Sequence, residues 1–362
     1  TMAQVIQRVQ RPALVLAPLA AVAFTLLVSA LLVLLAGAPV GRTYAAMLSG
    51  GFGSVFAWTE TLTRAVPLVL TGLAAAVAFR ARLYNIGAEG QLYGGAMAAV
   101  VVGGVAAGGE LFAPAWLVFA LMLAAAALTG ALLLLGPAWL KAKLGVDEVV
   151  TMLLLKFIVL LAVSALLDGP MKDAGALGWP QSLPLAGELE LARLVPGARL
   201  HSGLLIAIVL ALVLWQVMAH TVLGFDIRAS GANARAAAFA GVPALRTTLV
   251  VALVSGGLAG LAGAIEVAGR TGYVTLDMSP GYGYSGIVIA MLAGLHPLGV
   301  LAAGIFIAGV LVGADSMSRV VGVPTYIADV IVATALIAVL VATLATQYRL
   351  RWRMAALPLA AS

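Results

Sequence analysis

Long apolar runs separated by short polar segments make up most of the chain. Because a helix needs about 20 apolar residues to cross the hydrocarbon core of a bilayer, the pattern predicts an all-α polytopic membrane protein with about ten transmembrane helices. The eighth predicted helix is too short to cross alone, so the alternative count is nine. The predicted spans are Pro12–Ala36, Thr61–Phe79, Ala88–Ala107, Phe112–Gly136, Val149–Leu167, Gly203–Ala219, Thr247–Ala268, Ser285–Leu295, Leu298–Gly313 and Tyr326–Ala345.

One polar segment is unusual for its place between two apolar runs. Arg80–Gly95 carries Asn85, Glu89 and Gln91 among four glycines. Polar groups at membrane depth persist only where protein or a watery cavity satisfies them, and transporters aim such broken helices at substrate. The alternative is an ordinary loop followed by a capped helix start. Asn85, Glu89 and Gln91 are therefore candidate residues of a substrate path.

A second break, Arg270–Ser285, is rich in Gly and Tyr and follows the seventh predicted span as the first break follows the second. Five spans separate the breaks, so the two halves would be inverted copies, and paired broken helices in inverted repeats are typical of transporters. We expect one transmembrane domain, 1–362, with halves 1–200 and 201–362. Tyr282 and Tyr284 join the candidate path because tyrosines suit a heteroaromatic or sugar ligand; aromatic anchoring at the membrane interface is the alternative.

Two polar segments are long enough to hold structure of their own. The outer loop, 168–200, has four prolines and a net charge of −1, which indicates an ordered exterior cap or docking surface. In the inner loop, 221–246, alanine-rich Asn233–Ala240 favours a helix, with Asn233 as N-cap and Gly241 near its end. We expect a short amphipathic helix on the cytoplasmic face; a plain connector is the alternative.

Lys and Arg gather in the segments that a cytoplasmic N-terminus would place inside, as the positive-inside rule requires. These segments hold 12 of the 20 basic residues, the outer segments with the adjoining span end at Arg64 hold seven, and the remaining one, Lys156, lies in the interior of a span. We therefore expect both termini to be cytoplasmic, which favours ten spans over nine. The start of the chain resembles a signal peptide, but its apolar run is long, so we expect an uncleaved first span.

Lys156 lies near the middle of the fifth predicted span. A central Lys costs roughly 2.5–3.5 kcal/mol on the insertion scale, whereas the Leu, Ile, Val and Phe residues of this span contribute about −6 kcal/mol, so the span still inserts. The ammonium must face a wet cavity or a partner. The open alternatives are a role in the cavity and a structural pair with a carboxylate such as Glu89, Glu266 or Asp329.

Composition narrows the class of protein. Of all residues 63% are hydrophobic and 9% charged, against roughly 25% charged in soluble domains. Cytoplasmic loops explain the net charge of +6, so no nucleic-acid partner is expected. There is no cysteine, and the three histidines lack metal-ligand spacing, so no disulfide or metal site is predicted. No catalytic residue is predicted either, because the common hydrolase, metalloprotease and phosphate-loop motifs are missing.

Five stretches together resemble one family. Leu83–Gln91 is similar to the Asn-Ile-Gly-x-Glu-Gly-Gln signature of bacterial ATP-binding-cassette (ABC) importer permeases in the ribose and branched-chain amino-acid superfamily. Gly145–Leu153 and Asp168–Asp173 resemble the branch that imports nucleosides and is linked to basic membrane proteins. Gly281–Ile287 and Gly322–Pro324 resemble two further family stretches, and the resemblance runs from about residue 67 to 342.

The inner loop resembles the Gly-x-Asn-Pro-x-Ala-Ala-x-x-Ala-Gly coupling segment of the same family. The resemblance implies an import subunit in the bacterial cytoplasmic (inner) membrane that works with a second related permease and an extracytoplasmic binding protein. It also implies a cytoplasmic ATPase that holds ATP and Mg, since no cofactor is implied for this chain itself. The implied ATPase-coupling residues are Asn233, Arg235, Ala236, Ala237, Ala240 and Gly241.

Three positions depart from the family pattern. Ala234 replaces a Pro of the coupling segment, Ser285 stands where relatives often carry Asp, and Lys156 stands where relatives often carry Asn. The resemblance implies that Ser285 and Lys156 lie in the substrate path. A Lys in the path would favour an anionic or acceptor-rich cargo. The expected function is a path for a nucleoside or nucleobase, with a pentose or other simple sugar as the alternative. A stand-alone ion-coupled transporter is a more distant alternative, because it would need no alanine-rich inner loop.

Overall fold

The computed structural model describes residues 4–7, 13–105 and 109–322, and after these residues 326–327, 330, 333–334, 337–338, 341 and 348–351. The elements of the described residues are helices, apart from two four-residue strands. The chain forms two compact units: Thr1–Leu48 with Gly313–Ser362, and Ser49–Val312. They are called the terminal unit and the central unit below.

The terminal unit contains α1 (Ala13–Leu35) and most of α2 (Val40–Phe52). The two helices are bent by 116° at a short break, where Gly37 adopts a φ of 74° that favours glycine. The sequence predicted α1 but not α2, because the glycines, Arg and Ser of α2 lower its apolar content below that of a span. The buried residues Val33, Ala38, Ala314 and Met317 form the core of this unit.

The two strands also belong to the terminal unit. β1 (Gln4–Gln7) pairs antiparallel with β2 (Tyr348–Arg351), with Gln4 opposite Arg351. The other described elements are helices, as the sequence predicted, and the sequence analysis did not predict this short pair of strands.

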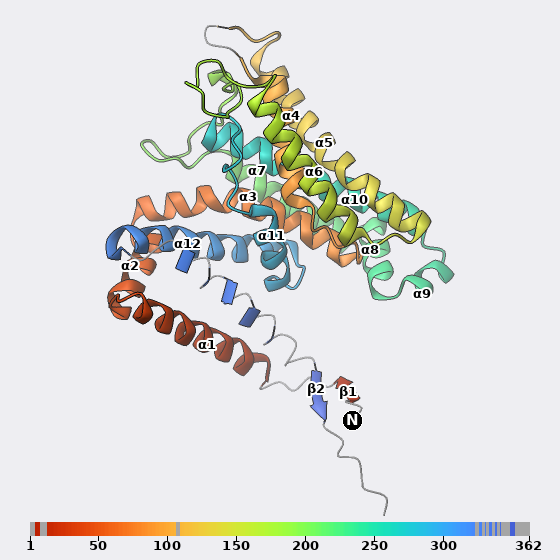
Figure 1. Cartoon of the computed structure of the whole chain (residues 1–362). Helices are drawn as coiled ribbons and strands as arrows, with labels where there is room; N and C mark the ends of the chain where they lie inside the picture. Colours follow the sequence, from red (N-terminus) through yellow and green to blue (C-terminus); the bar gives the residue numbers. More distant parts are fainter. Residues whose placement is uncertain are drawn as a thin grey trace, which may run out of the picture. The chain divides into compact units, whose positions relative to one another are not determined.

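The central unit holds most of the helices (Figure 1). In chain order these are α3 (Val55–Arg80), α4 (Ala88–Gly103), α5 (Ala115–Leu144), α6 (Glu148–Asp168), the 3₁₀ turn η1 (Gly187–Leu189), α7 (Gly203–His220), α8 (Val222–Ala232), α9 (Ala234–Phe239), α10 (Ala244–Glu266), the π-helix η2 (Val267–Thr271), α11 (Tyr282–Leu292) and α12 (Pro297–Val321), which continues into the terminal unit.

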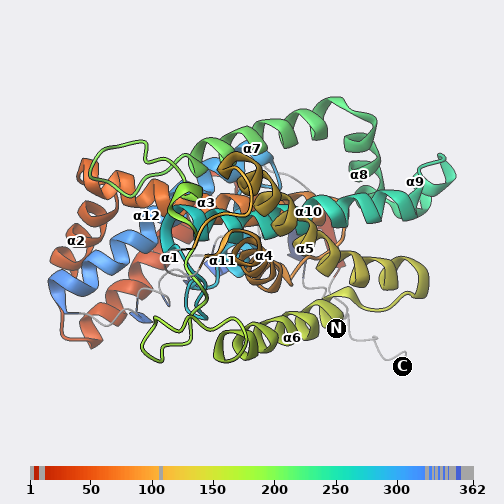
Figure 2. The same ribbon diagram turned by 90° about the horizontal axis from the view of Figure 1, so that it is seen from above.

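Helix α10 lies in the middle of the central unit and packs against α3, α4 and α5. Figure 2 shows α10 and α5 between α7 on one side and α6 on the other. Small residues permit this close packing: a Cβ at Gly256 would overlap the carbonyl of Gly130, and one at Gly260 would overlap the carbonyl of Ala126. Helices in lipid associate through such small-residue contacts, because hydrophobicity alone does not drive them together.

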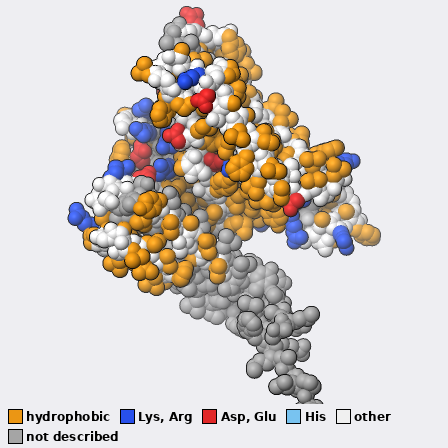
Figure 3. Space-filling view, viewed as in Figure 1, with side chains coloured by type: hydrophobic (Ala, Val, Ile, Leu, Met, Phe, Trp, Pro, Cys, Tyr) orange, Lys and Arg blue, Asp and Glu red, His pale blue; other side chains and the backbone are white. Residues whose placement is uncertain are grey.

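Among the described residues, six helices are long and apolar enough to cross a membrane, or up to seven if the bent pair α1–α2 forms one span. The count of ten therefore stays a prediction, and most of the tenth predicted span, 326–345, lies outside the described residues. Helix α6 matches its prediction within one residue at each end, whereas α5 continues eight residues past Gly136 to a left-handed Gly145. Figure 3 shows many hydrophobic side chains on the outer surface of the central unit, where α5 and α6 lie in Figure 1.

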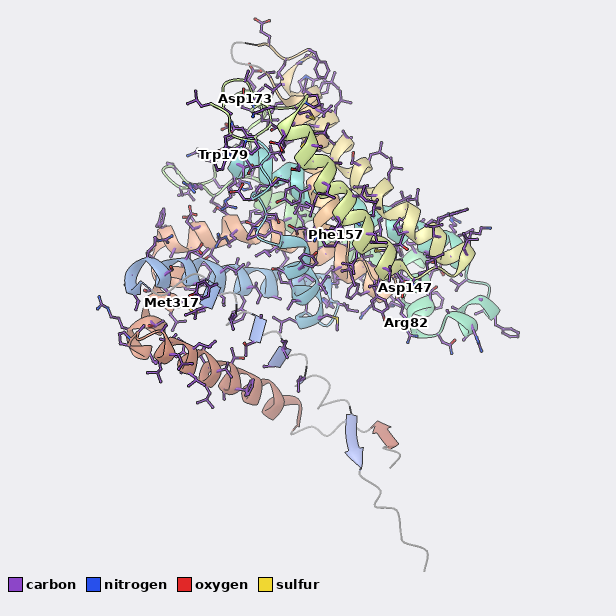
Figure 4. All side chains as sticks on the ribbon, in the orientation of Figure 1. Arg82, Asp147, Phe157, Asp173, Trp179 and Met317 are labelled. Atoms are coloured by element: carbon purple, nitrogen blue, oxygen red, sulfur yellow. The ribbon has the colours of Figure 1, made fainter. Side chains whose placement is uncertain are left out.

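The two long polar segments lie at opposite ends of the central unit. In Figure 4, Asp173 and Trp179 of the outer loop lie at one end, and Arg82 and Asp147 lie at the other end with α8 and α9. The outer loop is ordered, as predicted, because its backbone is hydrogen-bonded to the segment after α10: Ser182 N donates to Val274 O over 3.0 Å and Leu185 N donates to Gly272 O over 2.7 Å. Whether the termini are cytoplasmic stays a prediction.

Candidate functional site

The first predicted break lies between α3 and α4. It covers residues 81–87, so Glu89 and Gln91 belong to the first turns of α4 rather than to the break itself. Asn85 and Gln91 are buried and exchange two amide hydrogen bonds of 2.9 Å each. Asn85 also donates to Ser255 Oγ on α10 over 2.9 Å. In this conformation the two amides join the break to α4 and α10, rather than facing an open path.

The two predicted breaks meet in space. Glu89 Oε2 accepts a hydrogen bond of 2.6 Å from Gly283 N at the start of α11. A Cβ at Gly283 would overlap the backbone nitrogen of Glu89, so the first turns of α4 and α11 are in direct contact. A carboxylate at a helix N-terminus is favoured by the unpaired N–H groups and the helix dipole. Glu89, buried between these two short helices, therefore stabilises the junction electrostatically.

Lys156 lies beside this junction. Its Nζ is 4.9 Å from the centroid of the Tyr284 ring and 4.3 Å from that of Phe157. Gly90 packs so closely that its Cβ would lie 2.9 Å from Lys156 Cα, and both residues line a small pocket with Gln91. The partners of this ammonium are thus aromatic faces, which attract cations.

No described carboxylate forms an ion pair with Lys156. Of the three predicted partners, Glu266 forms an ion pair with Arg270 over 2.6 Å. Glu89 accepts a hydrogen bond from Gly283 N and interacts with Lys156 only by longer-range electrostatic attraction. Asp329 lies outside the described residues. The alternative of a direct carboxylate pair is therefore wrong for Glu266, and the position of Lys156 between pocket and aromatic rings fits a role in the path.

Tyr282 lies on the other side of the junction. Its side chain is buried and its Oη accepts a hydrogen bond of 2.9 Å from Arg270 Nη1, which also bonds to Glu266. Arg270 belongs to the π-helix η2, a rare element that often occurs at functional sites. Ser285 lies in the first turn of α11 and is half-buried.

An outer cavity of about 520 Å³ opens next to Arg270. Arg193 and Arg199 from the outer loop line it, together with the aromatic rings of Trp179 and Tyr273. The volume is typical of small-molecule sites. The sequence analysis missed this cavity, because it counted Arg193 and Arg199 only toward the net charge of the outer loop. Nothing local in the sequence indicates that these two arginines lie beside the second break.

His201 lies just before α7 against the same π-helix. Its Nδ1 accepts a hydrogen bond of 3.2 Å from Gly203 N, and its Nε2 is buried without a partner among the described residues. Burial, with a smaller contribution from Arg270, lowers the pKa of His201 from its usual 6.5 to about 4. The neutral ring is therefore the form that fits the folded protein.

We expect the folded chain to lose stability as the pH falls from about 6.5 to 4. A lowered pKa in the folded protein means that, as the pH falls, the unfolded state takes up the proton first. The contribution of neutral His201 to the free energy of unfolding is therefore complete above pH 6.5 and is lost as the pH falls to about 4. The loss amounts to about 3 kcal/mol. Thermal unfolding in detergent across this range should show a smaller loss for His201→Asn. The control is His296→Asn, which changes an exposed histidine that also accepts from a helix-start N–H, Gly299 N; equal pH profiles for His201→Asn and the parent protein would contradict the prediction.

The predicted helix of the inner loop is present as α9. Asn233 is its N-cap, and its Oδ1 accepts from Arg235 N and Ala236 N over 3.1 Å each. Gly241, with a φ of 86°, ends the helix as expected. Ala234 begins α9, so the helix forms without the Pro of the family pattern.

The candidate coupling residues on and around α9 differ in their exposure. Ala237 is buried, whereas Asn233, Arg235, Ala236, Ala240 and Gly241 are exposed. Phe239, at the end of α9, is 98% exposed and was missed by the sequence analysis. A fully exposed Phe beside an exposed Arg is the kind of pair that anchors protein interfaces. Helix α8 was also missed, because the pattern of 222–232 has no clear apolar face.

A family model described as "Branched-chain amino acid transport system / permease component" matches residues 57–340. The chain belongs to this permease family. The match confirms the resemblance seen in the sequence, and it spans both breaks, the outer loop, α9 and the outer cavity.

Three relatives of this permease are similar over most of their length. The guanosine ABC transporter permease protein NupP of Bacillus subtilis is 33% identical over 351 residues, 96% of this chain and 97% of NupP. The glucose ABC transporter permease protein TsgB13 of Haloferax volcanii is 38% identical over 316 residues, 84% of this chain and 82% of TsgB13. The nucleoside ABC transporter permease protein NupB of Lactococcus lactis is 30% identical over 333 residues, 88% of each chain.

Proposed function

We propose that this permease is the transmembrane subunit of an ABC importer and forms the translocation path for a nucleoside or related nucleobase. The observation that carries the proposal is the contact between the two broken helices at Glu89 and Gly283. Paired half-helices that meet inside a bundle are the arrangement on which transporters build substrate sites. Two relatives named for nucleosides, NupP and NupB, support the class of cargo.

The proposed path runs past Lys156, Tyr284 and Ser285 on one side of the junction. Tyr284 offers a partly exposed ring on which a base can stack, and Lys156 offers a donor for carbonyl or anionic groups. Asn85, Glu89, Gln91 and Tyr282 are proposed to position the half-helices in the conformation described here and to reach the path when the halves move. The outer cavity, with its arginines and aromatic rings, is the proposed point at which cargo enters.

The proposed source of energy is a separate cytoplasmic ATPase that binds ATP and Mg. Its docking element on this chain is α9, through Asn233, Arg235, Ala236, Ala240, Gly241 and Phe239, with Ala237 holding the helix to the bundle. Exposed Arg235 and Phe239 support a docking role, since a connector would gain nothing from a fully exposed Phe.

Further partners follow from the same proposal. A second related permease would complete the membrane unit, as a heterodimer or a homodimer, and an extracytoplasmic binding protein would deliver cargo to the outer loop. The proposed location is the bacterial cytoplasmic membrane with both termini inside. Pairing of β1 with β2, which places residues 4–7 beside residues 348–351, supports a common side of the membrane for these two segments.

Sugar import is the second candidate, because TsgB13 is named for glucose and is 38% identical to this chain. The two are separated by uptake of labelled guanosine into proteoliposomes that contain the complete transporter, with unlabelled nucleosides, bases and glucose as competitors. The proposal expects nucleosides or bases to compete and glucose to have no effect. Competition by glucose alone would overturn the nucleoside assignment and favour the sugar.

Replacing Lys156 by Met is expected to change cargo preference. A hydrogen bond from a charged donor contributes roughly 1.5–3 kcal/mol, so the KM for an acceptor-rich purine should rise by at least about tenfold, with a smaller effect on a cargo that offers fewer acceptors. Uptake assays on Lys156→Met measure both. The control, Lys143→Met, removes the same charge from the exposed end of α5; unchanged uptake and preference in Lys156→Met would sink the hypothesis.

A further inference from the structure

A second cavity, of about 430 Å³, lies at the end of the central unit that carries α8 and α9. The end of α3, the segment after it, α8 and the end of α11 form its walls. Three guanidinium groups line it, those of Arg80, Arg82 and Arg228, and no described Asp or Glu does. Among the described residues none of these three arginines forms an ion pair with a carboxylate, whereas nearby Lys141 is paired with Glu148.

One buried polar atom of a cavity residue has no partner among the described residues. It is Nε of Arg80. The only described hydrogen bond of the Arg80 side chain is a long one of 3.5 Å, from Nη1 to Gly294 O. A buried donor on a charged group is costly when unpaired, so an acceptor-rich anion would satisfy what the protein leaves open.

The rest of the lining indicates which anion. Phe79, Met291 and Leu295 supply an apolar wall beside the arginines. A small ion such as free phosphate would contact the guanidinium groups and leave this wall uncovered. A phospholipid presents both parts at once, a phosphate for the arginines and an acyl chain for the apolar wall. Basic pockets between helices on the cytoplasmic side of a membrane recognise anionic lipid headgroups in this way.

The cavity is also fixed in shape. Arg82 has a φ of 56°, a left-handed conformation that is strained for a residue other than glycine. Lys141 stabilises this turn by donating to Arg82 O over 2.6 Å. On the opposite wall, Gly231 packs directly on the backbone carbonyl of Arg80. Strain of this kind persists where the surroundings hold it, and it often marks ligand clamps.

We propose that this cavity binds the phosphate group of an anionic phospholipid from the cytoplasmic leaflet. Because its walls join α3 to α8, which leads into α9, a bound lipid would fasten the inner loop to the bundle at the place where it must transmit movement. The binding step needs neither cargo nor ATPase. Its failure is therefore distinguishable from a failure of the proposed transport function.

The experiment measures lipid binding to the full-length chain, purified in neutral detergent, by native mass spectrometry. We expect phosphatidylglycerol to bind in a 1:1 complex and phosphatidylcholine to bind at least about tenfold more weakly, because basic residues near the membrane surface attract anionic headgroups. The double variant Arg80→Gln/Arg228→Gln should lose that preference. The matched control is Arg246→Gln, which removes an exposed charge at the start of α10 outside the cavity.

If the double variant does not fold, as judged by thermal unfolding in phosphatidylcholine, Arg228→Gln alone gives the same comparison. An equal loss of preference in Arg246→Gln would overturn the site, because the effect would then follow net charge. Inorganic phosphate is tested as a competitor: displacement of the lipid at millimolar phosphate would overturn the lipid assignment in favour of a free-phosphate site. Persistence of the lipid complex at that concentration supports it.

Discussion

Deletion of residues 233–240 is expected to abolish ATP-driven uptake while leaving the helix bundle folded. Helix α9 is capped by Asn233 and ended by Gly241, and apart from Ala237 its residues are exposed. The bundle therefore loses little packing when α9 is removed. The ATPase loses its proposed docking element, so co-purification of the ATPase with the chain should disappear together with uptake.

A single substitution gives the sharper form of this prediction. Phe239→Ala should weaken ATPase binding by at least about tenfold, because aromatic anchors at the centre of interfaces each contribute on the order of 2 kcal/mol. Phe112→Ala is the matched control, since Phe112 is also largely exposed but lies before α5 rather than on α9. The interpretation of α9 as a docking helix fails if ATPase binding and uptake survive both the deletion and Phe239→Ala.

Gly283→Ala is expected to have the second large effect. The added methyl group would overlap the backbone nitrogen of Glu89, and backbone cannot rotate away as a flexible side chain would. The first turns of α4 and α11 would have to separate, which breaks the 2.6 Å hydrogen bond from Gly283 N to Glu89. Overpacking of this kind costs about 1–3 kcal/mol or more, so both the midpoint of thermal unfolding and uptake should fall.

The control for this substitution is Gly136→Ala on α5. Nothing lies within 4 Å of a Cβ at Gly136, and Ala favours a helix over Gly by about 1 kcal/mol, so this variant should be as stable as the parent protein or more so. Gly283→Ala with parental stability and uptake would show that the two half-helices do not need this contact.

Local signals in the sequence predicted the elements that depend on local physics. Helix α6 follows from a long apolar run that only Lys156 interrupts with a charge between its ends, and the start and end of α9 follow from Asn233 and Gly241, whose effects reach only a few residues. The resemblance to the permease family was likewise carried by short stretches such as 83–91. These parts of the fold and of the coupling segment required no knowledge of distant contacts.

Contacts between distant residues could not be predicted in the same way. Glu89 and Gly283 are 194 positions apart, and nothing in either sequence segment specifies the other. The polarity of Asn85 and Gln91 indicated exposure to a path, whereas the fold pairs them with each other. Lys156 was expected to have a cavity or a carboxylate beside it; it lines a small pocket, and aromatic rings from α6 and α11, which the sequence did not indicate, flank its ammonium.

The proposed function requires that this permease has no energy source of its own and that a separate ATPase acts on it through α9. It is tested by reconstituting the full-length chain alone in vesicles and measuring accumulation of labelled guanosine, with and without imposed proton and sodium gradients. We expect no accumulation against a gradient until the ATPase, the second permease, the binding protein and ATP are all present. Uphill accumulation by the chain alone, without nucleotide hydrolysis, would contradict the account.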